Sequence, residues 1–163
     1  MASAKGPSAT ALDGREARCT DAVARASIDA WREELGLSNV KPAMCLDARD
    51  DQWSFEDASI DALVNINMIH ISPWSATLGL LRHAQRVLKR GAPLLTYGPY
   101  FQSGVATAPS NIAFHESLRS RNPEWGVRNL DDVVAAANAT AMALEAVIAM
   151  PANNLCILFR RGT

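Results

Sequence analysis

The sequence has little that would direct it to nucleic acid or to a membrane. Its 163 residues include 16 lysines and arginines and 17 aspartates and glutamates, which gives a formal net charge of −1. A balance of this kind leaves no basic face for nucleic acid and no charge excess for an anionic membrane surface. We therefore expect neither nucleic acid nor a membrane among the partners of this chain.

Cysteine is also scarce. Cys19, Cys45 and Cys156 lie far apart, and no C-x-x-C pair occurs. Dispersed cysteines in odd number argue against a disulfide framework and against a zinc site. Cys45 and Cys156 lie in apolar, strand-like runs, where a free cysteine usually packs as a small core residue. This usage favours a reducing compartment, and we expect a cytoplasmic protein.

Several catalytic signatures are missing. The sequence has no G-x-S-x-G nucleophile elbow, and it has no H-E-x-x-H motif, G-x-x-x-x-G-K-[ST] phosphate loop or EF-hand loop. The three histidines, His70, His83 and His115, are not at the spacing of metal ligands. We expect no metal ion.

Apolar runs and helical patterns alternate along the rest of the chain. Residues 1–19 are rich in small and charged residues without periodicity, which predicts a disordered leader. One domain is expected over 20–163, opening with a helix that Thr20-Asp21 can cap and that Gly36 ends. Further helices are expected near 73–90, 112–121 and 130–141, and strands at 43–46, 60–66, 92–97, 144–150 and 155–159.

The order of these elements predicts the fold class. Strands joined by helices are typical of an α/β domain with a largely parallel sheet. The last two strands flank the turn PANN, whose asparagines tolerate left-handed geometry. We therefore expect the sheet to end in an antiparallel hairpin.

Polar residues follow three of the expected strands. In open α/β sheets, ligands bind beyond the carboxyl ends of the strands. Those ends carry Asp47 and Ala48, residues 67–70, and residues 97–99. If the three strands are neighbours, these residues line one crevice, and that convergence predicts a binding site.

Each of these clusters also has a purely structural interpretation. Asp47 can simply start a loop, and His70 can be a hydrogen-bonded histidine near the start of a helix. Ser72 and Pro73 read as the cap and the first residue of the next helix. The sequence at 97–99 can be a plain turn, where glycine permits unusual backbone angles. No single pattern here is specific.

Five segments occur in an order that carries a resemblance: LDARDDQW, INMIHISPW, LLRHAQRVLKRGAPLLTYGPY, SNIAFHESLRSRNPEWGVRNLDDV and MPANNLCILFRR. Through them, residues 38–161 resemble the methyltransferase-like 26 family, which comprises class I S-adenosylmethionine-dependent methyltransferase-like proteins. The resemblance implies a Rossmann-like class I methyltransferase sheet with a C-terminal antiparallel hairpin. It also implies S-adenosylmethionine as cofactor and an unknown methyl acceptor, either a small molecule or a protein.

The resemblance assigns roles to particular residues. Residues just beyond the strand at 60–66 would face the methyl-transfer centre, which makes Asn67 and His70 the candidate catalytic residues. The candidate cofactor-binding residues are Asp47, Ala48, Asn65 and Met68, and the candidate substrate-binding residues are Trp74, Tyr97, Asn111 and Asn153. A carboxylate suits the adenine amino group, and methyl transfer needs mainly alignment of its reactants.

The sequence departs from the family at the glycine-rich loop. Class I methyltransferases have a first strand followed by a G-x-G-x-G turn, which lets the backbone approach the cofactor. No two glycines here are spaced G-x-G, so we expect an N-terminally truncated domain that lacks the first strand and this loop. Because that strand is central, its neighbours either pair with each other or leave part of the sheet loose.

Two functional hypotheses stay open. The first is an S-adenosylmethionine-dependent methyltransferase-like protein, which is inactive if the missing loop is essential. The second is a non-catalytic module, derived from the same fold, that binds a small molecule or a protein. A nicotinamide-dependent oxidoreductase has no motif in its favour.

Overall fold

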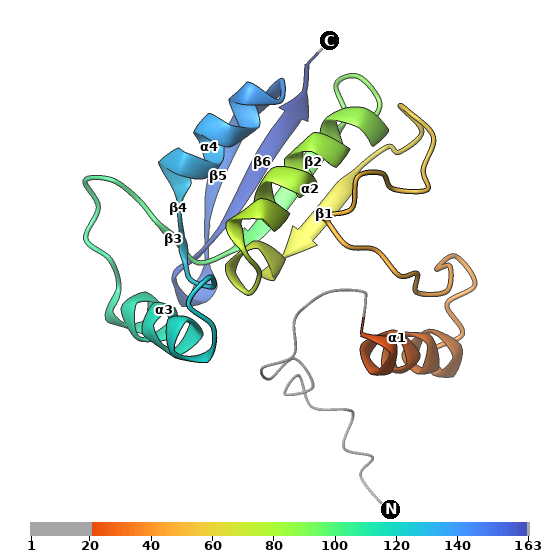
Figure 1. Cartoon of the computed structure of the whole chain (residues 1–163), viewed down its shortest axis with the longest axis horizontal. Coiled ribbons are helices and arrows are strands. Elements are labelled where there is room, and N and C mark those ends of the chain that lie inside the picture. Colours follow the sequence, from red (N-terminus) through yellow and green to blue (C-terminus); the bar gives the residue numbers. More distant parts are fainter. Residues whose placement is uncertain (1–20, 163) are drawn as a thin grey trace, which may run out of the picture. The chain divides into compact units, whose positions relative to one another are not determined.

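The structure is a computed structural model that describes residues 21–162 (Figure 1). The chain divides into two units, Met1–Asp47 and Ala48–Thr163, which are described separately below. The leader expected over residues 1–19 lies outside the described residues.

The described part of the first unit contains one helix, α1 (Ala22–Glu34). Asp21 caps it, because its Oδ1 accepts a hydrogen bond from the backbone N–H of Val23 at 2.8 Å. Gly36 follows the helix with a φ of +61°. The cap and the stop predicted from the sequence are both confirmed. No residue of α1 is buried, and Ile28 is 46% exposed.

The strand expected at 43–46 does not form, so this prediction was wrong. A strand needs a neighbour to take up its backbone groups, and no described strand pairs with this run. The N–H of Ala43 donates instead to the Asp29 side chain at 2.8 Å. Cys45, expected in the core, is exposed.

The second unit is built on a four-stranded sheet in the order β1-β2-β6-β5. The strands β1 (Leu63–Ile66) and β2 (Pro93–Gly98) are parallel, with Asn65 opposite Thr96. The strand β6 (Asn154–Arg161) is antiparallel both to β2 and to β5 (Met142–Met150). The terminal hairpin is therefore confirmed. The described sheet is mixed rather than largely parallel, because residues 43–46 add no strand to it.

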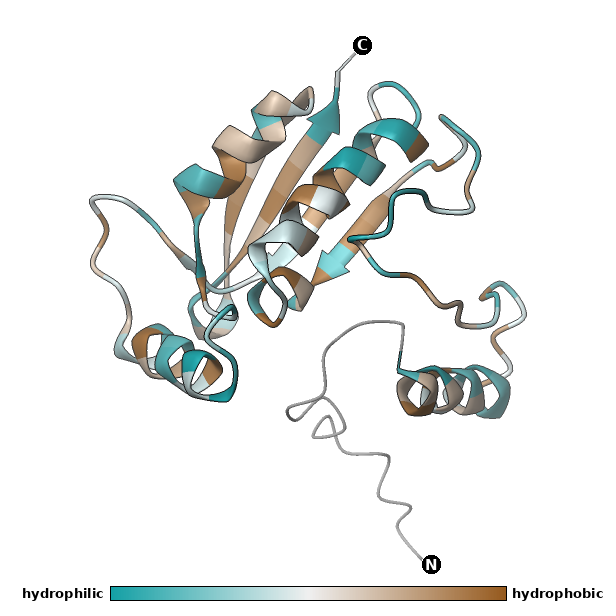
Figure 2. Cartoon of the chain, viewed as in Figure 1, coloured by the Kyte–Doolittle hydropathy of each residue, from teal (hydrophilic) through white to brown (hydrophobic). Residues whose placement is uncertain are grey.

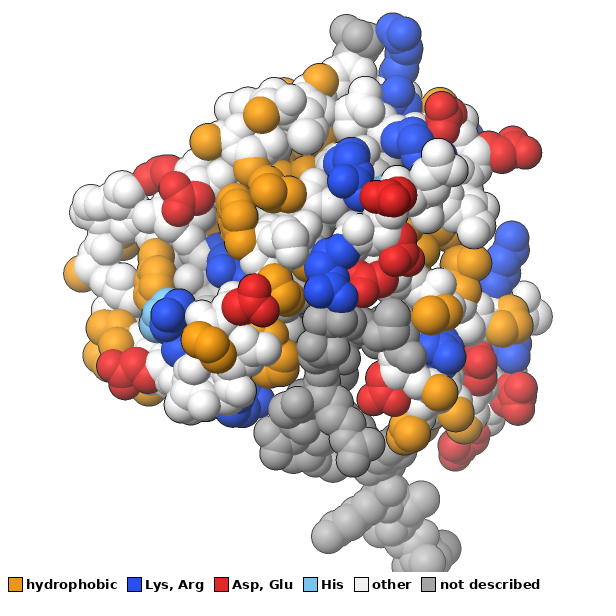
Figure 3. All heavy atoms as spheres, in the orientation of Figure 1, with side chains coloured by type: hydrophobic (Ala, Val, Ile, Leu, Met, Phe, Trp, Pro, Cys, Tyr) orange, Lys and Arg blue, Asp and Glu red, His pale blue; other side chains and the backbone are white. Residues whose placement is uncertain are grey.

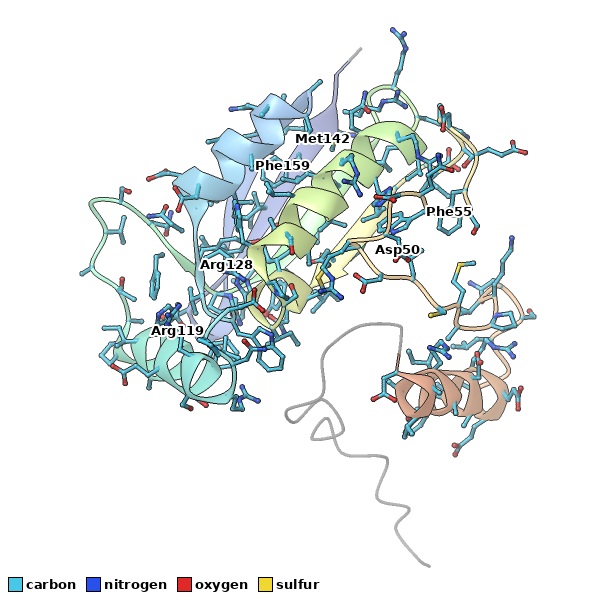
Figure 4. All side chains as sticks on the ribbon, viewed as in Figure 1. Asp50, Phe55, Arg119, Arg128, Met142 and Phe159 are labelled. Atoms are coloured by element: carbon cyan, nitrogen blue, oxygen red, sulfur yellow. The ribbon has the colours of Figure 1, made fainter. Side chains whose placement is uncertain are left out.

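Two helices cover one face of this sheet, α2 (Trp74–Val87) and α4 (Leu130–Ala139) (Figure 1). Alternate residues of β2 and β6 point into the core beneath them, so Leu94, Ile157 and Phe159 are fully buried. Figure 2 shows the hydrophobic colour concentrated on the central strands and on parts of these helices. Figure 4 labels Phe159 and Met142, the latter also fully buried.

One edge of the sheet carries exposed apolar side chains. Val64 and Ile66 of β1 alternate with buried Asn65, and each is 61% exposed. Among the described residues no strand pairs with the free side of β1. The sequence left open whether the neighbouring strands pair with each other or part of the sheet is loose, and in the described part residues 43–46 do not pair with β1.

The remaining elements follow the ends of the strands. A single 3₁₀ turn (Met68–His70) comes after β1. The short strands β3 (Tyr100–Phe101) and β4 (Arg128–Asn129) pair in parallel, and α3 (Pro109–Arg121) lies between them in the chain. A second 3₁₀ turn (Pro151–Asn153) joins β5 to β6.

The starts of two helices differ from the sequence pattern. Ser72 does not cap α2, because its Oγ donates to the Met68 carbonyl at 2.8 Å. Pro73 stands just before the first helical residue, Trp74, rather than at it. The helix α4 is capped by Asn129, whose Oδ1 accepts from the N–H of Asp131 at 2.8 Å. None of the described helices is long and apolar enough to cross a bilayer.

The visible surface of the described residues is mixed in charge. Figure 3 shows acidic and basic side chains interspersed with apolar ones over this face. Many acidic and basic groups pair at the surface, as Lys89 does with Asp61 at 2.6 Å and Arg160 with Glu145. Such exposed pairs contribute little to stability.

Candidate functional site

The segments that follow β1 and β2 meet at one edge of the sheet. The N–H of Asn67 donates to the Tyr97 carbonyl at 2.9 Å, and Asn67 itself has a φ of +59°. A Cβ built on Gly98 would lie 2.6 Å from His70 Nε2 and 2.9 Å from Asn67 Oδ1. Asn67, His70 and Gly98 therefore enclose one small space, which we call the strand-end cluster.

His70 is the most enclosed member of the strand-end cluster. Its side chain is fully buried, and neither ring nitrogen has a hydrogen-bond partner among the described residues. The ring packs edge-to-face on Tyr100 with a centroid distance of 5.0 Å. Burial, with a smaller contribution from the charge of Arg128, lowers the pKa of His70 to about 3. The imidazole is therefore neutral at physiological pH.

Arg128 of β4 holds the backbone behind His70 in place. Its Nε donates to the Ile69 carbonyl at 2.8 Å, and its Nη2 donates to the carbonyls of Ser72 and Glu124. Figure 4 shows Arg128 reaching toward the start of α2. The guanidinium also lies 5.7 Å from the centre of the Trp74 ring. Burial lowers the pKa of Arg128.

Two further polar side chains are buried in the sheet beside this cluster. Asn65 Oδ1 has no hydrogen-bond partner among the described residues. Thr96, opposite it on β2, shares a hydrogen bond of 2.7 Å with the Tyr100 hydroxyl. Burial raises the pKa of Tyr100 to about 12. Because a buried acceptor without a donor is costly, Asn65 Oδ1 is suited to receive one from a ligand.

A cavity of about 230 Å³ has Tyr100 in its wall. It lies between the loop after β3, the start of α3 and the β5–β6 hairpin, and we call it the hairpin cavity. It is lined by Tyr100, Gln102, Val105, Ala106, Thr107, Ala108, Asn111, Ala149, Met150, Asn153, Asn154 and Leu155. Tyr100 thus lines the cavity and also packs on His70.

The structure brings some of the residues expected to bind substrate into this cavity and leaves others outside it. Asn111 and Asn153 both line it, although they are 42 residues apart in the chain. Tyr97 is not among the lining residues, but its hydroxyl accepts a hydrogen bond from the side-chain amide of Asn154, which is one of them, at 3.1 Å. Trp74 packs against Arg128 instead.

The residues expected to bind the cofactor are less closely grouped. Asn65 and Met68 follow one another along β1 and its turn, and Met68 is tied to Ser72 by the hydroxyl contact to its carbonyl. Asp47 belongs to the first unit and Ala48 to the second. Within the second unit, a Cβ on Gly79 would lie 1.9 Å from the Ala48 carbonyl oxygen, so Ala48 packs closely on α2.

Sequence reasoning missed Tyr100, Thr96 and Asn154. The pattern does not indicate Tyr100, because this residue comes after the expected turn at 97–99. Thr96 lies inside an apolar run and Asn154 is part of the turn PANN, so both patterns indicate a structural role. The one available signal was the aromatic in GPYF, at the carboxyl end of a buried strand.

Comparison with solved structures identifies the class of this fold. The mitomycin 7-O-methyltransferase MmcR superposes with a TM-score of 0.72 at 14% identity, over 85% of this chain and 39% of that one. An O-methyltransferase family protein from Burkholderia thailandensis gives 0.67 at 13% identity, over 84% and 41%. PH0226 from Pyrococcus horikoshii gives 0.66 at 16%, over 87% and 70%. The described domain has a methyltransferase-like, Rossmann-like α/β fold.

The family itself follows from the sequence profile. The profile of family DUF938, described as a protein of unknown function, matches residues 8–161. The chain belongs to this family. It spans about two fifths of the length of several solved structures that it resembles, among them MmcR at 39% and the pyocyanin biosynthetic protein PhzM at 41%.

Proposed function

We propose that this chain acts as an S-adenosylmethionine-dependent methyltransferase-like protein of the methyltransferase-like 26 type, with a small molecule or a protein as methyl acceptor. One observation carries the proposal. The strand-end cluster and the hairpin cavity adjoin each other through Tyr100, beyond the carboxyl ends of two parallel strands. This is where α/β sheets of this kind bind their ligands.

The residues present fit a cofactor with exposed hydrogen-bond donors. Asn65 Oδ1 is a buried acceptor without a partner among the described residues, and an ammonium or amino group would satisfy it. Under the proposal Ala48, Asn65 and Met68 of the second unit hold the cofactor. When bound, S-adenosylmethionine supplies an activated methyl group on a sulfonium sulfur.

Under this proposal Asn67 contacts the reacting groups, and His70 positions it. The Asn67 Oδ1 and the His70 ring both occupy the space that a side chain at position 98 would need, so the ring packs beside Asn67 and limits how its side chain can turn. With a pKa of about 3 and no exposed surface, His70 is a poor proton acceptor at neutral pH. Methyl transfer tolerates this, because alignment of the reactants supplies most of the rate.

The experiment is a calorimetric titration of S-adenosylmethionine into the purified full chain, after circular dichroism has shown that the chain is folded. Saturable binding, weakened at least tenfold by Asn65→Ala, supports the proposal. The matched control is Asn138→Ala, an exposed asparagine of α4, which should bind like the wild type. A folded chain that takes up no cofactor refutes the proposal.

A second candidate is a non-catalytic module that binds a small molecule or a protein. It is favoured by the absence of any G-x-G pair and by the unpaired side of β1 in the described sheet. It predicts that a ligand enters the hairpin cavity while S-adenosylmethionine neither binds nor changes the affinity of that ligand. If S-adenosylmethionine instead changed the affinity of the chain for the cavity ligand, this would favour the methyltransferase.

A further inference from the structure

The hairpin cavity is rich in hydrogen-bond acceptors. Each of its three asparagines donates at least one side-chain N–H to the protein, and Asn154 donates both. Asn111 donates to the Asn153 carbonyl at 2.9 Å, and Asn153 donates to the Ser110 hydroxyl at 3.1 Å. Asn154 donates to the Tyr97 hydroxyl at 3.1 Å. None of the three Oδ1 atoms accepts a hydrogen bond within the described chain, so three amide oxygens remain available to a ligand.

The cavity contains no group that would neutralise an anion. None of the described side chains that line it is charged. The nearby Ser103 hydroxyl donates to the Asp131 carboxylate, so the charge beside the loop is negative. A carboxylate or phosphate would lose its hydration without gaining a cation, which is costly. Amide oxygens repel anions and attract hydroxyl hydrogens.

The volume and the walls limit the size of the ligand. A dry cavity of about 150 Å³ accommodates one benzene molecule, and this cavity measures about 230 Å³. Its apolar surface comes from Val105, Ala106, Met150 and Leu155. A single ring with small substituents fits both the volume and the walls.

We propose that the hairpin cavity binds a neutral small molecule, about the size of one substituted ring, that donates hydrogen bonds from its hydroxyl groups to the asparagine amide oxygens. The preference for a ligand that donates hydrogen bonds follows from the lining of the cavity alone and does not require the proposed function. The role of that hydroxyl as methyl acceptor rests on the proposed function. In that step the hydroxyl oxygen bonds to the methyl carbon, the carbon–sulfur bond breaks with its electron pair passing to sulfur, and the hydroxyl proton passes to water.

The test uses three probes of similar size, titrated into the ¹⁵N-labelled full chain and followed by NMR. Resorcinol offers two hydroxyl donors, 1,3-dimethoxybenzene offers none, and benzoate is an anion. We expect resorcinol to bind saturably and to shift the side-chain amide signals of Asn111, Asn153 and Asn154. The ether should bind at least tenfold more weakly, which corresponds to about 1.4 kcal/mol, and benzoate should not saturate. Equal binding of the ether, tighter binding of benzoate, or no binding of resorcinol would each overturn the proposal.

Two variants locate the binding. Asn154→Leu removes one amide oxygen and should weaken resorcinol at least fivefold, whereas Asn138→Leu on α4 should leave it unchanged. Because Asn154 also bonds Tyr97, a second variant guards against loss of folding. Val105→Trp changes a side chain that is 58% exposed and should block the cavity without unfolding the chain. Undiminished resorcinol binding to folded Val105→Trp would refute the assignment of the site.

The two proposals fail separately. Resorcinol binding in a chain that does not bind S-adenosylmethionine would leave the cavity assignment intact and refute the methyltransferase. Binding of S-adenosylmethionine by a chain that shows no preference for resorcinol over the ether would support the methyltransferase proposal and refute the cavity assignment.

Discussion

Gly98 offers the sharpest test of the strand-end cluster. It has a φ of +155°, and a Cβ at this position would meet His70 Nε2 at 2.6 Å, His70 Cδ2 at 2.8 Å and Asn67 Oδ1 at 2.9 Å. Real Cβ atoms do not approach other atoms this closely, and the fully buried imidazole has no free direction in which to move. We expect Gly98→Ala to lower the free energy of unfolding by about 2–3 kcal/mol through overpacking.

Gly104 is the matched control. It has a φ of +75°, and a Cβ there would meet no atom within 4 Å. Gly104→Ala should therefore cost only the backbone strain of about 1 kcal/mol. Urea unfolding followed by circular dichroism measures both changes, and for a domain of this size Gly98→Ala should lower Tm by about 4–10 °C.

A double-mutant cycle identifies the clash itself. His70→Ala removes the atoms that the new Cβ would meet, so the Gly98→Ala substitution should cost at least about 1 kcal/mol less in that background. Equal costs for Gly98→Ala and Gly104→Ala, or a cost that is unchanged when His70 is removed, would refute this account of how the cluster is packed.

The remaining predictions concern His70, Asn67 and Arg128. The pKa of His70 falls from 6.5 to about 3 on folding, so the unfolded chain binds more protons than the folded chain between these pH values. The free energy of unfolding should therefore fall as the pH drops below 6.5, by up to about 1.4 kcal/mol per pH unit. Unfolding of His70→Gln, measured over the same pH range, should show a shallower fall. Asn67→Ala should impair cofactor or ligand binding more than stability, whereas Leu81→Ala, in the core, should cost about 2–5 kcal/mol; equal losses of Tm would contradict this. Arg128→Lys should cost about 2 kcal/mol in urea unfolding through lost hydrogen bonds to backbone carbonyls, and an unchanged midpoint would count against that role.

Local signals in the sequence were sufficient for the helices and the hairpin. The Asp21 cap, the Gly36 stop and the asparagines of the 151–154 turn act on their immediate neighbours, so their effect can be read from a few residues. The two parallel strands could also be placed, and with them the meeting of Asn67 with residues 97–99.

What failed depends on distant partners. The run 43–46 has the composition of a strand, but a strand exists only when another offers its backbone groups. The hairpin cavity is lined both by the loop near residue 105 and by the turn near residue 153. No residue spacing in the sequence predicts that these two segments lie together. The burial of both His70 nitrogens likewise depends on Gly98 of β2 and Tyr100 of β3, which lie about 30 positions further along the sequence.

The free side of β1 has a consequence for how the protein behaves at high concentration. The run from Leu63 to Asn67 contains no proline, lysine or other charge, which are the features that usually keep exposed edges from recruiting further strands. Val64 and Ile66 are each 61% exposed, and no strand among the described residues pairs with the free side of β1. Exposed β-branched side chains beside unpaired backbone groups are the combination from which cross-β assembly grows. The rate at which a concentrated solution aggregates should therefore depend on this short run, and Val64→Lys should lower that rate.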